Sequence, residues 1–292
     1  MDMRFLKSLR FYLKTLLYKK FKSPIKKIKV GEFLLIANRE SRLDEFLERH
    51  KNYSRNFSKL VKQILIDDMD SLIIDIGANI GDTVALLRSE KVVNPILCIE
   101  GNPFYLNLFD QNIKNFDNVT LLRSFLSDKT EELNVQVFTN EGTAKIEKNN
   151  DGILIKMTTL DELINNNQIE NIRILKVDTD GFDILILTGA KEVVEKNQPV
   201  IFFEYDNDLN SSKTSCLSYL LSLRDKGYQN ALFYDNLGNF LISLDLSQVE
   251  LIRSLDKYIN KDSAFQYYDV AVFHEKDKKL AENIVATLLE YN

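Results

Sequence analysis

Short, almost uninterrupted apolar segments alternate with helix-like stretches along most of this 292-residue chain. The four strongest strand candidates are residues 72–76 (LIIDI), 95–100 (PILCIE), 172–177 (IRILKV) and 200–205 (VIFFEY). Strands with so few polar positions are typical of parallel sheets that helices cover on both faces. Strands that alternate with helices form doubly wound sheets. We therefore predict an α/β fold with a doubly wound, mostly parallel sheet.

Weaker patterns complete the predicted order of elements. Further strands are expected at 30–37, 119–125, 231–235 and 268–274, and a hairpin of 133–138 with 153–157 around a polar loop at 139–151. Helices are expected at 41–65, 82–90, 104–115, 161–165, 182–195, 212–226 and 277–290. Because no repeat and no long linker interrupts this pattern, we predict one domain over residues 31–292, preceded by an N-terminal extension at residues 1–30.

The net charge of −5 conceals a strong asymmetry. Residues 1–30 contain ten Lys or Arg and one acid, which gives +9, whereas the remaining 28 basic and 42 acidic residues give the body −14. An acidic body disfavours nucleic-acid binding, because that affinity comes from neutralising phosphates. Cys98 and Cys216 cannot form a disulfide framework, which favours a reducing, cytoplasmic location. Two cysteines and two histidines are also few for a zinc site.

The basic N-terminal segment has the pattern of an amphipathic helix. Over residues 3–22, apolar side chains recur every three or four positions, and most basic side chains fall on the opposite side. The charges interrupt every stretch that could serve as a signal peptide or a membrane span. Two interpretations stay open. The helix could lie on an anionic membrane surface, at the inner face of the membrane, or it could pack on the body or on the second subunit of a homodimer.

A glycine-containing turn follows the first strong strand. In LIIDIGANIGDT (72–83), Gly77 permits a tight turn and a close approach of a ligand to the backbone. Open α/β sheets bind nucleotides at such turns, but the G-x-x-x-G spacing differs from the G-x-G-x-x-G of dinucleotide sites. Asp75 and Asp82 flank the turn, where they would disfavour a phosphate and favour a cationic ligand such as S-adenosylmethionine. Glu100 ends the next strand, where an acid can accept hydrogen bonds from both ribose hydroxyls.

Carboxylates also gather at the ends of the two later strong strands: Asp178, Asp180, Asp183, Glu204 and Asp206. In a doubly wound sheet, both strand ends open into the same crevice as the glycine turn. A sugar hydroxyl is a poor nucleophile and needs a base, or a metal that lowers its pKa. Since neither histidine lies at a strand end facing the turn, the candidate catalytic carboxylates are Asp178, Asp180 and Glu204. Their spacing would also suit Mg²⁺ or Ca²⁺.

Each of these features also has a purely structural interpretation. The glycine turn could bind nothing, with Asp82 acting only on the helix dipole. Asp180 or Asp183 could cap a helix. Asp178 and Glu204 are harder to explain in this way, because each terminates an apolar strand.

In these segments the sequence resembles the FkbM family of S-adenosylmethionine-dependent methyltransferases. The resemblance spans residues 30–275 and rests on DIGANIGDT (75–83), IEGNP (99–103), TLDEL (159–163), LKVDTDGFDILILTGA (175–190) and PVIFFEYD (199–206). It implies a Rossmann-like class I methyltransferase fold and O-methylation, usually of a sugar hydroxyl on a polysaccharide, lipid-linked glycan or natural product. It also implies an acceptor side lined by residues 176–183. The cofactor contacts that it implies are Asp75, Gly77, Asn79, Gly81 and Glu100, and the same motifs add Asp82, Thr83 and Asn102.

Two departures from the family pattern concern the site. Gly101 stands where the family often has proline, and Asp180 and Asp183 are shorter than the acids often found there. The main alternative function is a non-catalytic, methyltransferase-like binding module of a glycan-assembly complex. A nucleotide-sugar dehydrogenase is disfavoured by the missing G-x-G-x-x-G. The acceptor, a glycan or a small molecule, is not encoded in any readable motif of the loops expected to bind it, which are 139–151, 206–214 and 235–240.

Overall fold

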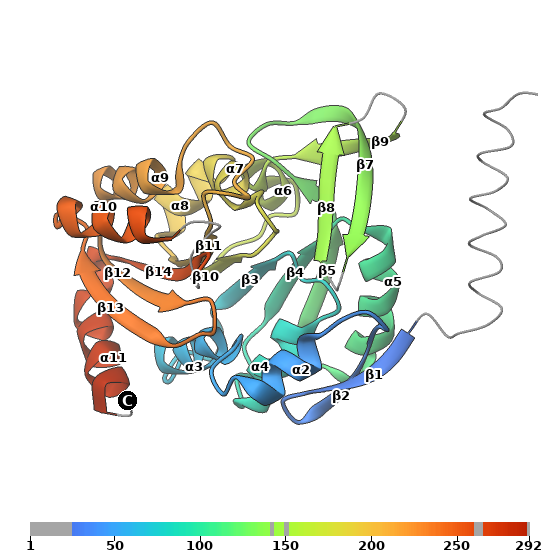
Figure 1. Cartoon of the computed structure of the whole chain (residues 1–292), viewed down its shortest axis with the longest axis horizontal. Coiled ribbons are helices and arrows are strands. Elements are labelled where there is room, and N and C mark those ends of the chain that lie inside the picture. Colours follow the sequence, from blue (N-terminus) through green and yellow to red (C-terminus); the bar gives the residue numbers. More distant parts are fainter. Residues whose placement is uncertain (1–24, 141–142, 149–151, 260–264, 291–292) are drawn as a thin grey trace, which may run out of the picture.

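The computed structural model describes residues 25–140, 143–148, 152–259 and 265–290. Its centre is an eight-stranded sheet with helices on both faces (Figure 1). The strands of this sheet are β3 (Leu72–Ile76), β4 (Ile96–Glu100), β5 (Val119–Arg123), β10 (Ile172–Val177), β11 (Val200–Tyr205), β12 (Tyr228–Asp235), β13 (Phe240–Asp245) and β14 (Tyr268–His274). The helices are α2 (Leu43–Arg49), α3 (Arg55–Ile64), α4 (Asp82–Ser89), α5 (Pro103–Asn112), α6 (Leu160–Asn166), α7 (Asp183–Thr188), α8 (Lys191–Asn197), α9 (Cys216–Ser222), α10 (Val249–Tyr258) and α11 (Lys278–Glu290). The helix expected at residues 3–22 lies outside the described residues.

The central sheet has the strand order β13-β12-β14-β11-β10-β3-β4-β5. The strands from β11 to β5 run parallel to one another, and β14, β12 and β13 form an antiparallel edge. The predicted doubly wound, mostly parallel sheet is therefore confirmed. The strand order reverses between β3 and β10. From β3 the chain continues to β4 and β5 toward one edge of the sheet, whereas from β10 it continues to β11 on the other side. Ligands of such sheets bind beyond the carboxyl ends of the strands at this reversal.

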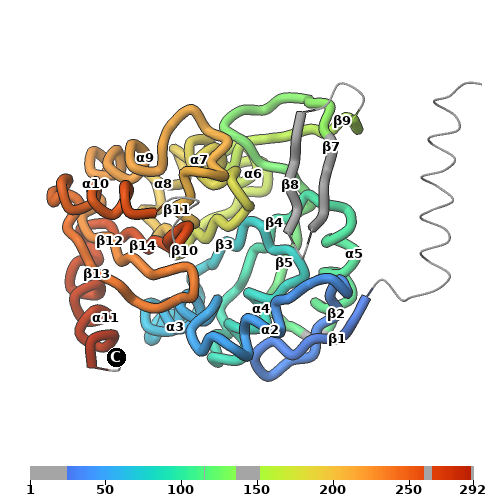
Figure 2. Tube along the Cα trace, in the orientation of Figure 1, coloured from blue at the N-terminus to red at the C-terminus, as the bar shows by residue number. Residues whose placement is uncertain are grey.

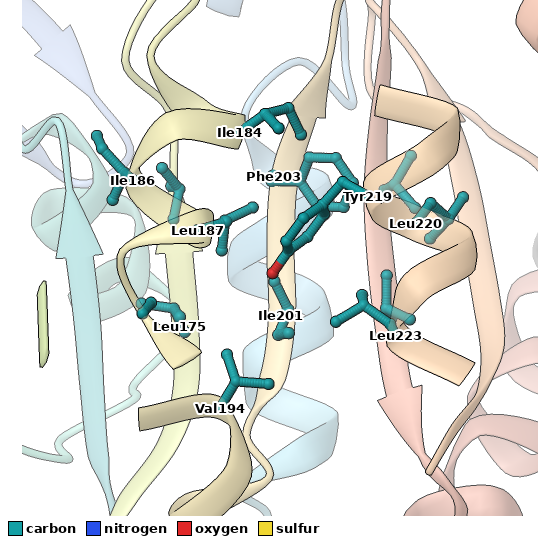
Figure 3. Packing of buried hydrophobic residues seen from close by; sticks show 14 of the residues in the cluster. Leu175, Ile184, Ile186, Leu187, Val194, Ile201, Phe203, Tyr219, Leu220 and Leu223 are labelled. Atoms are coloured by element: carbon teal, nitrogen blue, oxygen red, sulfur yellow. The ribbon is translucent and has the colours of Figure 1, made fainter. Parts of the chain in front are cut away.

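Alternate residues of the central strands face two separate apolar cores. On one face, Leu175 and Phe203 pack with residues of α7, α8 and α9 (Figure 3). On the other face, the ring of Phe202 lies 4.9 Å from the ring of Phe57 in α3. The helices α3 and α11, far apart in the sequence, lie side by side on this second face (Figure 2). Lys176 follows Leu175, so its side chain points toward the second face.

A smaller four-stranded sheet stands beside the central one. It contains β6 (Phe125–Leu126), β7 (Glu131–Asn140), β8 (Thr143–Lys148) and β9 (Ile153–Thr158). The predicted antiparallel pairing of 133–138 with 153–157 is confirmed, because β7 pairs with β9, but the two do not form a hairpin, since β8 lies between them in the sequence. The loop expected at 139–151 is wrong in part, because β8 pairs there with β7. The segment TAKIEK largely alternates polar and apolar residues, which suits a strand with one solvent-facing side.

Two predicted helices, 41–65 and 182–195, are each divided into two helices: α2 with α3, and α7 with α8. The second division has a clear cause. A Cβ on Gly189 would lie 2.4 Å from the carbonyl oxygen of Ser127, so the chain passes very close to that loop. Asp161 then accepts hydrogen bonds of 3.0 and 2.9 Å from two backbone N–H groups of α8, which starts a new helix. Strand β13 and helix α10 were not predicted.

The strand expected at 30–37 is one arm of a hairpin, β1 (Ile25–Val30) with β2 (Phe33–Asn38). Gly31 forms the turn with a φ of +58°. Asn112 of α5 ties this hairpin to the glycine turn. Its Oδ1 accepts a hydrogen bond from the N–H of Ile36 at 2.7 Å, and its Nδ2 donates to the carbonyls of Ile36 and Ile80 at 2.9 Å each. The hairpin therefore has a fixed place next to the site.

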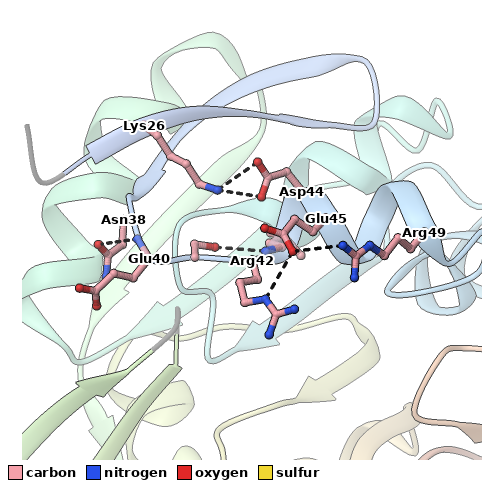
Figure 4. Close-up of polar contacts among 9 residues, drawn as sticks. Lys26, Asn38, Glu40, Arg42, Asp44, Glu45 and Arg49 are labelled. Atoms are coloured by element: carbon pink, nitrogen blue, oxygen red, sulfur yellow. Dashed lines mark hydrogen bonds and ion pairs between the residues drawn. The ribbon is translucent and has the colours of Figure 1, made fainter.

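Polar contacts hold α2 against the same hairpin (Figure 4). Lys26 of β1 forms an ion pair with Asp44 at 2.9 Å. Glu45 pairs with Arg42 at 3.4 Å and with Arg49 at 3.8 Å. Partly exposed pairs of this kind contribute at most about 1 kcal/mol each. Their importance lies in position, because α2 and the residues before it line the wider of the two clefts described below.

The N-terminal boundary of the domain stays a prediction, since residues 1–24 are not described. Strand β1 lies before the expected boundary at residue 30, yet Ile28 and Val30 are buried in a core shared with Leu86 of α4. Within the described ranges, no helix is both long enough and apolar enough to cross a membrane.

Candidate functional site

The turn after β3 brings two strand ends into close contact. Gly77 has a φ of +82°, and its N–H donates to the carbonyl of Ile99 at 3.0 Å. A Cβ at Gly77 would lie 1.9 Å from the backbone oxygen of Asp178, so only glycine fits between the ends of β3 and β10. Gly81, at a φ of +86°, precedes α4, and a Cβ there would meet only the ring of Phe109 at 3.4 Å. The geometry therefore demands glycine more strongly at 77 than at 81.

Glu100, at the end of β4, reaches back to the glycine turn. Its Oε2 accepts a hydrogen bond from the N–H of Asn79 at 3.0 Å. Its Oε1 accepts from the N–H groups of Gly101 at 2.9 Å and Asn102 at 2.7 Å. Burial raises the pKa of Glu100, although these three donors counteract the shift. Since a carboxylate has about four lone-pair positions, Glu100 can still accept a hydrogen bond from a ligand.

A cleft opens beside Glu100, at the ends of the central strands. Its apolar walls are Ile76, Ile99, Phe125, Leu126, Met157, Phe182 and Ile186. Asn102 lies at its edge. Its Oδ1 accepts from the N–H of Phe104 at 3.0 Å, whereas its Nδ2 is buried with no hydrogen-bond partner among the described residues. An apolar slot with a carboxylate and an unpaired donor suits an adenosine, so the residues fit that half of S-adenosylmethionine.

Beneath the glycine turn, Lys176 is buried between two carboxylates. Its Nζ lies 3.1 Å from Oδ1 of Asp75 and 3.1 Å from Oδ2 of Asp178. Burial lowers the pKa of Lys176, but the neighbouring carboxylates, Asp178 foremost, outweigh burial and raise it above its ordinary value. The ammonium group therefore stays charged. Asp75 has no exposed surface and lines neither of the two clefts described here. It neutralises Lys176 below the turn, and its expected contact with the cofactor stays a prediction.

A second, wider cleft continues from the first and has about 1,760 Å³ of empty space. The residues that line both clefts are Gly77, Asn79, Tyr105, Asp178 and Asp180. Of the other predicted site residues, Glu100 and Asn102 line the first cleft, and Asp82, Thr83 and Glu204 line the second. Gly81 lines neither of these two clefts and positions the start of α4 instead. The structure thus brings Asp178 and Asp180 to the place where the two clefts meet and places Glu204 in the second cleft.

The acids of the second cleft have unusual environments. Burial raises the pKa of Glu204 well above its ordinary value, and Asp178 and Asp183 raise it further. Asp183 accepts hydrogen bonds from the N–H of Thr179 at 3.2 Å, from its hydroxyl at 2.9 Å and from the N–H of Glu204 at 3.3 Å. Asp183 therefore anchors two strand ends and does not cap α7, whose N-cap position is Phe182. Burial also raises the pKa of Asp82 to about 6.

The described residues offer no ready metal site. Nowhere among them are three or more Asp, Glu, His or Cys side chains grouped so that they could hold a metal ion. The expectation that Asp178, Asp180 and Glu204 bind Mg²⁺ or Ca²⁺ is therefore not supported. The ammonium of Lys176 occupies one carboxylate oxygen of Asp178 instead.

The residues of the second cleft that were not among the predicted site residues include Tyr53, Asn56, Tyr267 and Asp269. The Nδ2 of Asn56 donates to Oδ2 of Asp269 at 2.7 Å across a sequence separation of 213 residues. No motif marks these residues. The one local signal is the charge of Asp269 in the otherwise apolar strand YDVAVF. Lys176 within IRILKV carried a similar signal.

The strand order, the glycine turn after β3 and the acid at the end of β4 define a Rossmann-like, S-adenosylmethionine-dependent class I methyltransferase. Residues 75–229, more than half of the chain, match the profile of the Methyltransferase FkbM domain. The chain belongs to the FkbM methyltransferase family, which confirms the resemblance of its motifs. Membership makes it an enzyme and disfavours the non-catalytic binding module.

Known proteins are similar at low identity. The 2-O-methyltransferase NoeI of Sinorhizobium fredii (strain NBRC 101917 / NGR234) is 24% identical over 204 residues, which are 62% of this chain and 83% of that protein. The solved methyltransferase FkbM from Methylobacillus flagellatus KT is 20% identical with a TM-score of 0.42, over 61% of this chain and 43% of the solved one. This chain therefore spans less than half of that solved chain. TYW2 of M. jannaschii, solved in complex with AdoMet, is 12% identical with a TM-score of 0.40, over 87% of each chain.

Proposed function

We propose that this methyltransferase transfers the methyl group of S-adenosylmethionine to a sugar hydroxyl of a polysaccharide, a lipid-linked glycan or a related glycoconjugate. The observation that carries the proposal is the junction of the two clefts at Gly77, Asp178 and Asp180. One cleft fits an adenosine, and the other is lined by carboxyl groups that can accept hydrogen bonds from hydroxyls. The relative NoeI is a 2-O-methyltransferase, which supports transfer to oxygen.

The cofactor would be held by residues of the first cleft and the junction. When bound, S-adenosylmethionine supplies a methyl group on a positively charged sulfur. Glu100 would accept hydrogen bonds from the ribose hydroxyls, and the unpaired Nδ2 of Asn102 would donate to the adenine. Asp178 would attract the cationic part of the cofactor, since one carboxylate oxygen is engaged by Lys176 and the side chain is 53% exposed.

The acceptor would enter from the second cleft. A reacting hydroxyl must be held about 3–3.5 Å from the methyl carbon and aligned with the bond that breaks. Asp178, Asp180 and Glu204 are the predicted carboxylates that could take its proton, an effect worth about 10²–10⁴-fold in rate. The acidic lining also disfavours acceptors whose reacting end carries a phosphate.

Two measurements test this proposal. Calorimetry of the full chain should detect binding of S-adenosylmethionine, and Glu100→Ala should weaken it while the fold stays intact. The matched control is Asp70→Asn, at an exposed acid beyond the opposite end of β3. Mass spectrometry of surface glycans should then show a methyl group that disappears when the gene is deleted. Unchanged glycans would reject the sugar acceptor, and no binding at millimolar cofactor would reject the cofactor site.

The basic segment at residues 3–22 has a separate proposed role. It would place the enzyme at an anionic membrane surface, at the cytoplasmic face where lipid-linked glycans are made, or it would contact a second subunit. Because β1 begins at Ile25, a chain starting at residue 25 removes this segment and leaves β1 complete. Liposome flotation of the full and shortened chains should differ, whereas equal flotation would reject the membrane role. Light scattering of the same two chains tests the homodimer.

A further inference from the structure

The register of the central strands places three carboxylates in one row along the second cleft. Val177 pairs with Phe203 in the parallel ladder, so Asp178 and Glu204 follow side by side. Glu204 pairs directly with Asp269 across the antiparallel ladder of β11 and β14. Adjacent strands lie about 4.8 Å apart, so the backbones at 178 and 269 are separated by about 10 Å. Asp178 at the cofactor junction and Asp269 therefore stand at the two ends of this row, with Glu204 between them.

Glu204 and Asp269 form a cross-strand pair of like charges. Side chains that pair directly across an antiparallel ladder lie about 4.5–5.5 Å apart at Cβ, and like charges repel at that distance. Burial raises the pKa of Asp269 to about 7, Asn56 counteracts this shift, and Asp178 adds to it. The charged groups that act on the pair are Lys176, Asp178, Asp180, Asp183 and Asp235, and Tyr53 and Tyr267 face it as neutral phenols. Asp269 also contributes to the raised pKa of Glu204, which favours a protonated Glu204 beside Asp269.

Asn56 supplies an observation independent of the acids. It is only 5% exposed, and its Nδ2 donates to Asp269 at 2.7 Å. A carboxylate only accepts hydrogen bonds, so the amide must turn its Nδ2 toward Asp269 and its Oδ1 away. That Oδ1 is buried and has no hydrogen-bond partner among the described residues. An unpaired buried acceptor is costly, so this atom indicates a donor that the ligand must bring, such as a hydroxyl.

We propose that Asp269 takes the proton of the acceptor hydroxyl, and that Asn56 is the positioning residue that orients Asp269 and accepts a second hydrogen bond from the acceptor. This inference rests on the proposed methyl transfer to a hydroxyl. As the hydroxyl oxygen bonds to the methyl carbon, its proton passes to Asp269, and the electron pair of the broken carbon–sulfur bond goes to sulfur. A negative carboxylate and a positive sulfonium thus become two neutral groups, and the products are a methyl ether and S-adenosylhomocysteine.

The first part of the test measures the carboxyl pair without any acceptor. In the full chain labelled with ¹³C at the aspartate carboxyl carbons, the signal of Asp269 is identified by its loss in Asp269→Asn. We expect a titration midpoint near pH 7. Asn56→Ala removes a donor and should raise the midpoint, whereas Glu204→Gln replaces a neutral carboxyl with a neutral amide and should leave it nearly unchanged. A midpoint near pH 4, or no response to Asn56→Ala, overturns the contact of Asn56 with Asp269 as the control of its proton.

The second part measures methyl transfer from labelled S-adenosylmethionine to a glycan extract of cells that lack this gene. We expect Asp269→Asn to lower kcat by roughly 100-fold or more, with the cofactor Kd within about twofold of the unmodified chain. Asn56→Ala should move the rising limb of the pH–rate profile to higher pH. The control Asp70→Asn should change neither kcat nor the pH–rate profile. Full turnover by Asp269→Asn overturns the inference. If the unmodified chain transfers no label, the sugar acceptor is rejected. The titration alone then tests the proposed role of Asp269.

Discussion

The two clefts of this methyltransferase are built in different ways. The cofactor cleft takes its turn and its buried acid from one short stretch of sequence, in which Gly77 shapes the turn and Glu100 and Asn102 follow one strand later, while Asp178 and Asp180 complete it at the junction. The acceptor cleft joins residues that are far apart, as the hydrogen bond between Asn56 and Asp269 shows. Backbone N–H groups hold the acid of the first cleft, whereas acids of the second face one another. The chain therefore encodes cofactor binding locally and acceptor chemistry through tertiary packing.

The largest effect should come from the lysine beneath both clefts. Lys176→Met leaves Asp75 buried without its partner, and breaking such a pair costs about 3–5 kcal/mol. Burial raises the pKa of Asp75, so the loss should be small below about pH 4, where the carboxyl is protonated, and grow as the pH rises. Urea unfolding at pH 4 and pH 8 measures it. The control Lys91→Met, at an exposed pair with Glu32, should change stability by less than about 1 kcal/mol.

The next effect is a difference in stability between alanine variants of Gly77 and Gly81. Gly77→Ala places a Cβ against the backbone of Asp178 at a positive φ, and we expect a loss of roughly 2–4 kcal/mol. Gly81→Ala has the same backbone strain but only an ordinary contact with Phe109, so roughly 1–2 kcal/mol is expected. Chemical denaturation of both variants tests the ranking. Equal losses would show that the close approach of β3 and β10 is not what requires glycine.

Substitutions of one acid in each cleft should separate binding from chemistry. Glu100→Gln keeps the shape but removes the charge that accepts hydrogen bonds, so the cofactor should bind roughly 10- to 100-fold more weakly. Glu204→Gln should leave that affinity within about threefold, because Glu204 lines only the second cleft. Calorimetry with S-adenosylmethionine measures both. Similar losses in the two variants would mean that the clefts are not distinct in function.

The pH dependence of stability tests the burial of the acids themselves. Burial raises the pKa of Asp82 to about 6 and of Asp269 to about 7, so the native state binds more protons than the unfolded chain between about pH 4 and 7. The free energy of unfolding should therefore fall as the pH rises through this window, by up to about 1.4 kcal/mol per pH unit for each proton. Urea unfolding from pH 5 to 8 should show this slope, and Asp269→Asn should reduce it. A stability that rises with pH would contradict the burial of these acids.

The same contrast explains what the sequence could predict. Apolar runs and glycine spacing are local patterns, so they located the parallel strands, the turn at Gly77 and the acid Glu100. These local patterns could not show that Asp75 is fully buried beneath the turn, because its burial depends on the residues of the neighbouring strands. Asn56 and Asp269 meet only after the sheet has formed. Leu241 and Ile242 of the unpredicted β13 are exposed at an edge, where the apolar pattern that marks a buried strand is weak.

Amide hydrogen exchange of the full chain, with and without saturating S-adenosylhomocysteine, tests the separation of the clefts most directly. The structure predicts slower exchange at the glycine turn from Gly77 to Gly81, at Gly101 and Asn102, and at Phe125 beside the apolar slot. Exchange around Asn56 and Asp269 should stay unchanged. If the ligand slowed exchange only around Asn56 and Asp269, or nowhere, the result would contradict a cofactor site built on the glycine turn and Glu100.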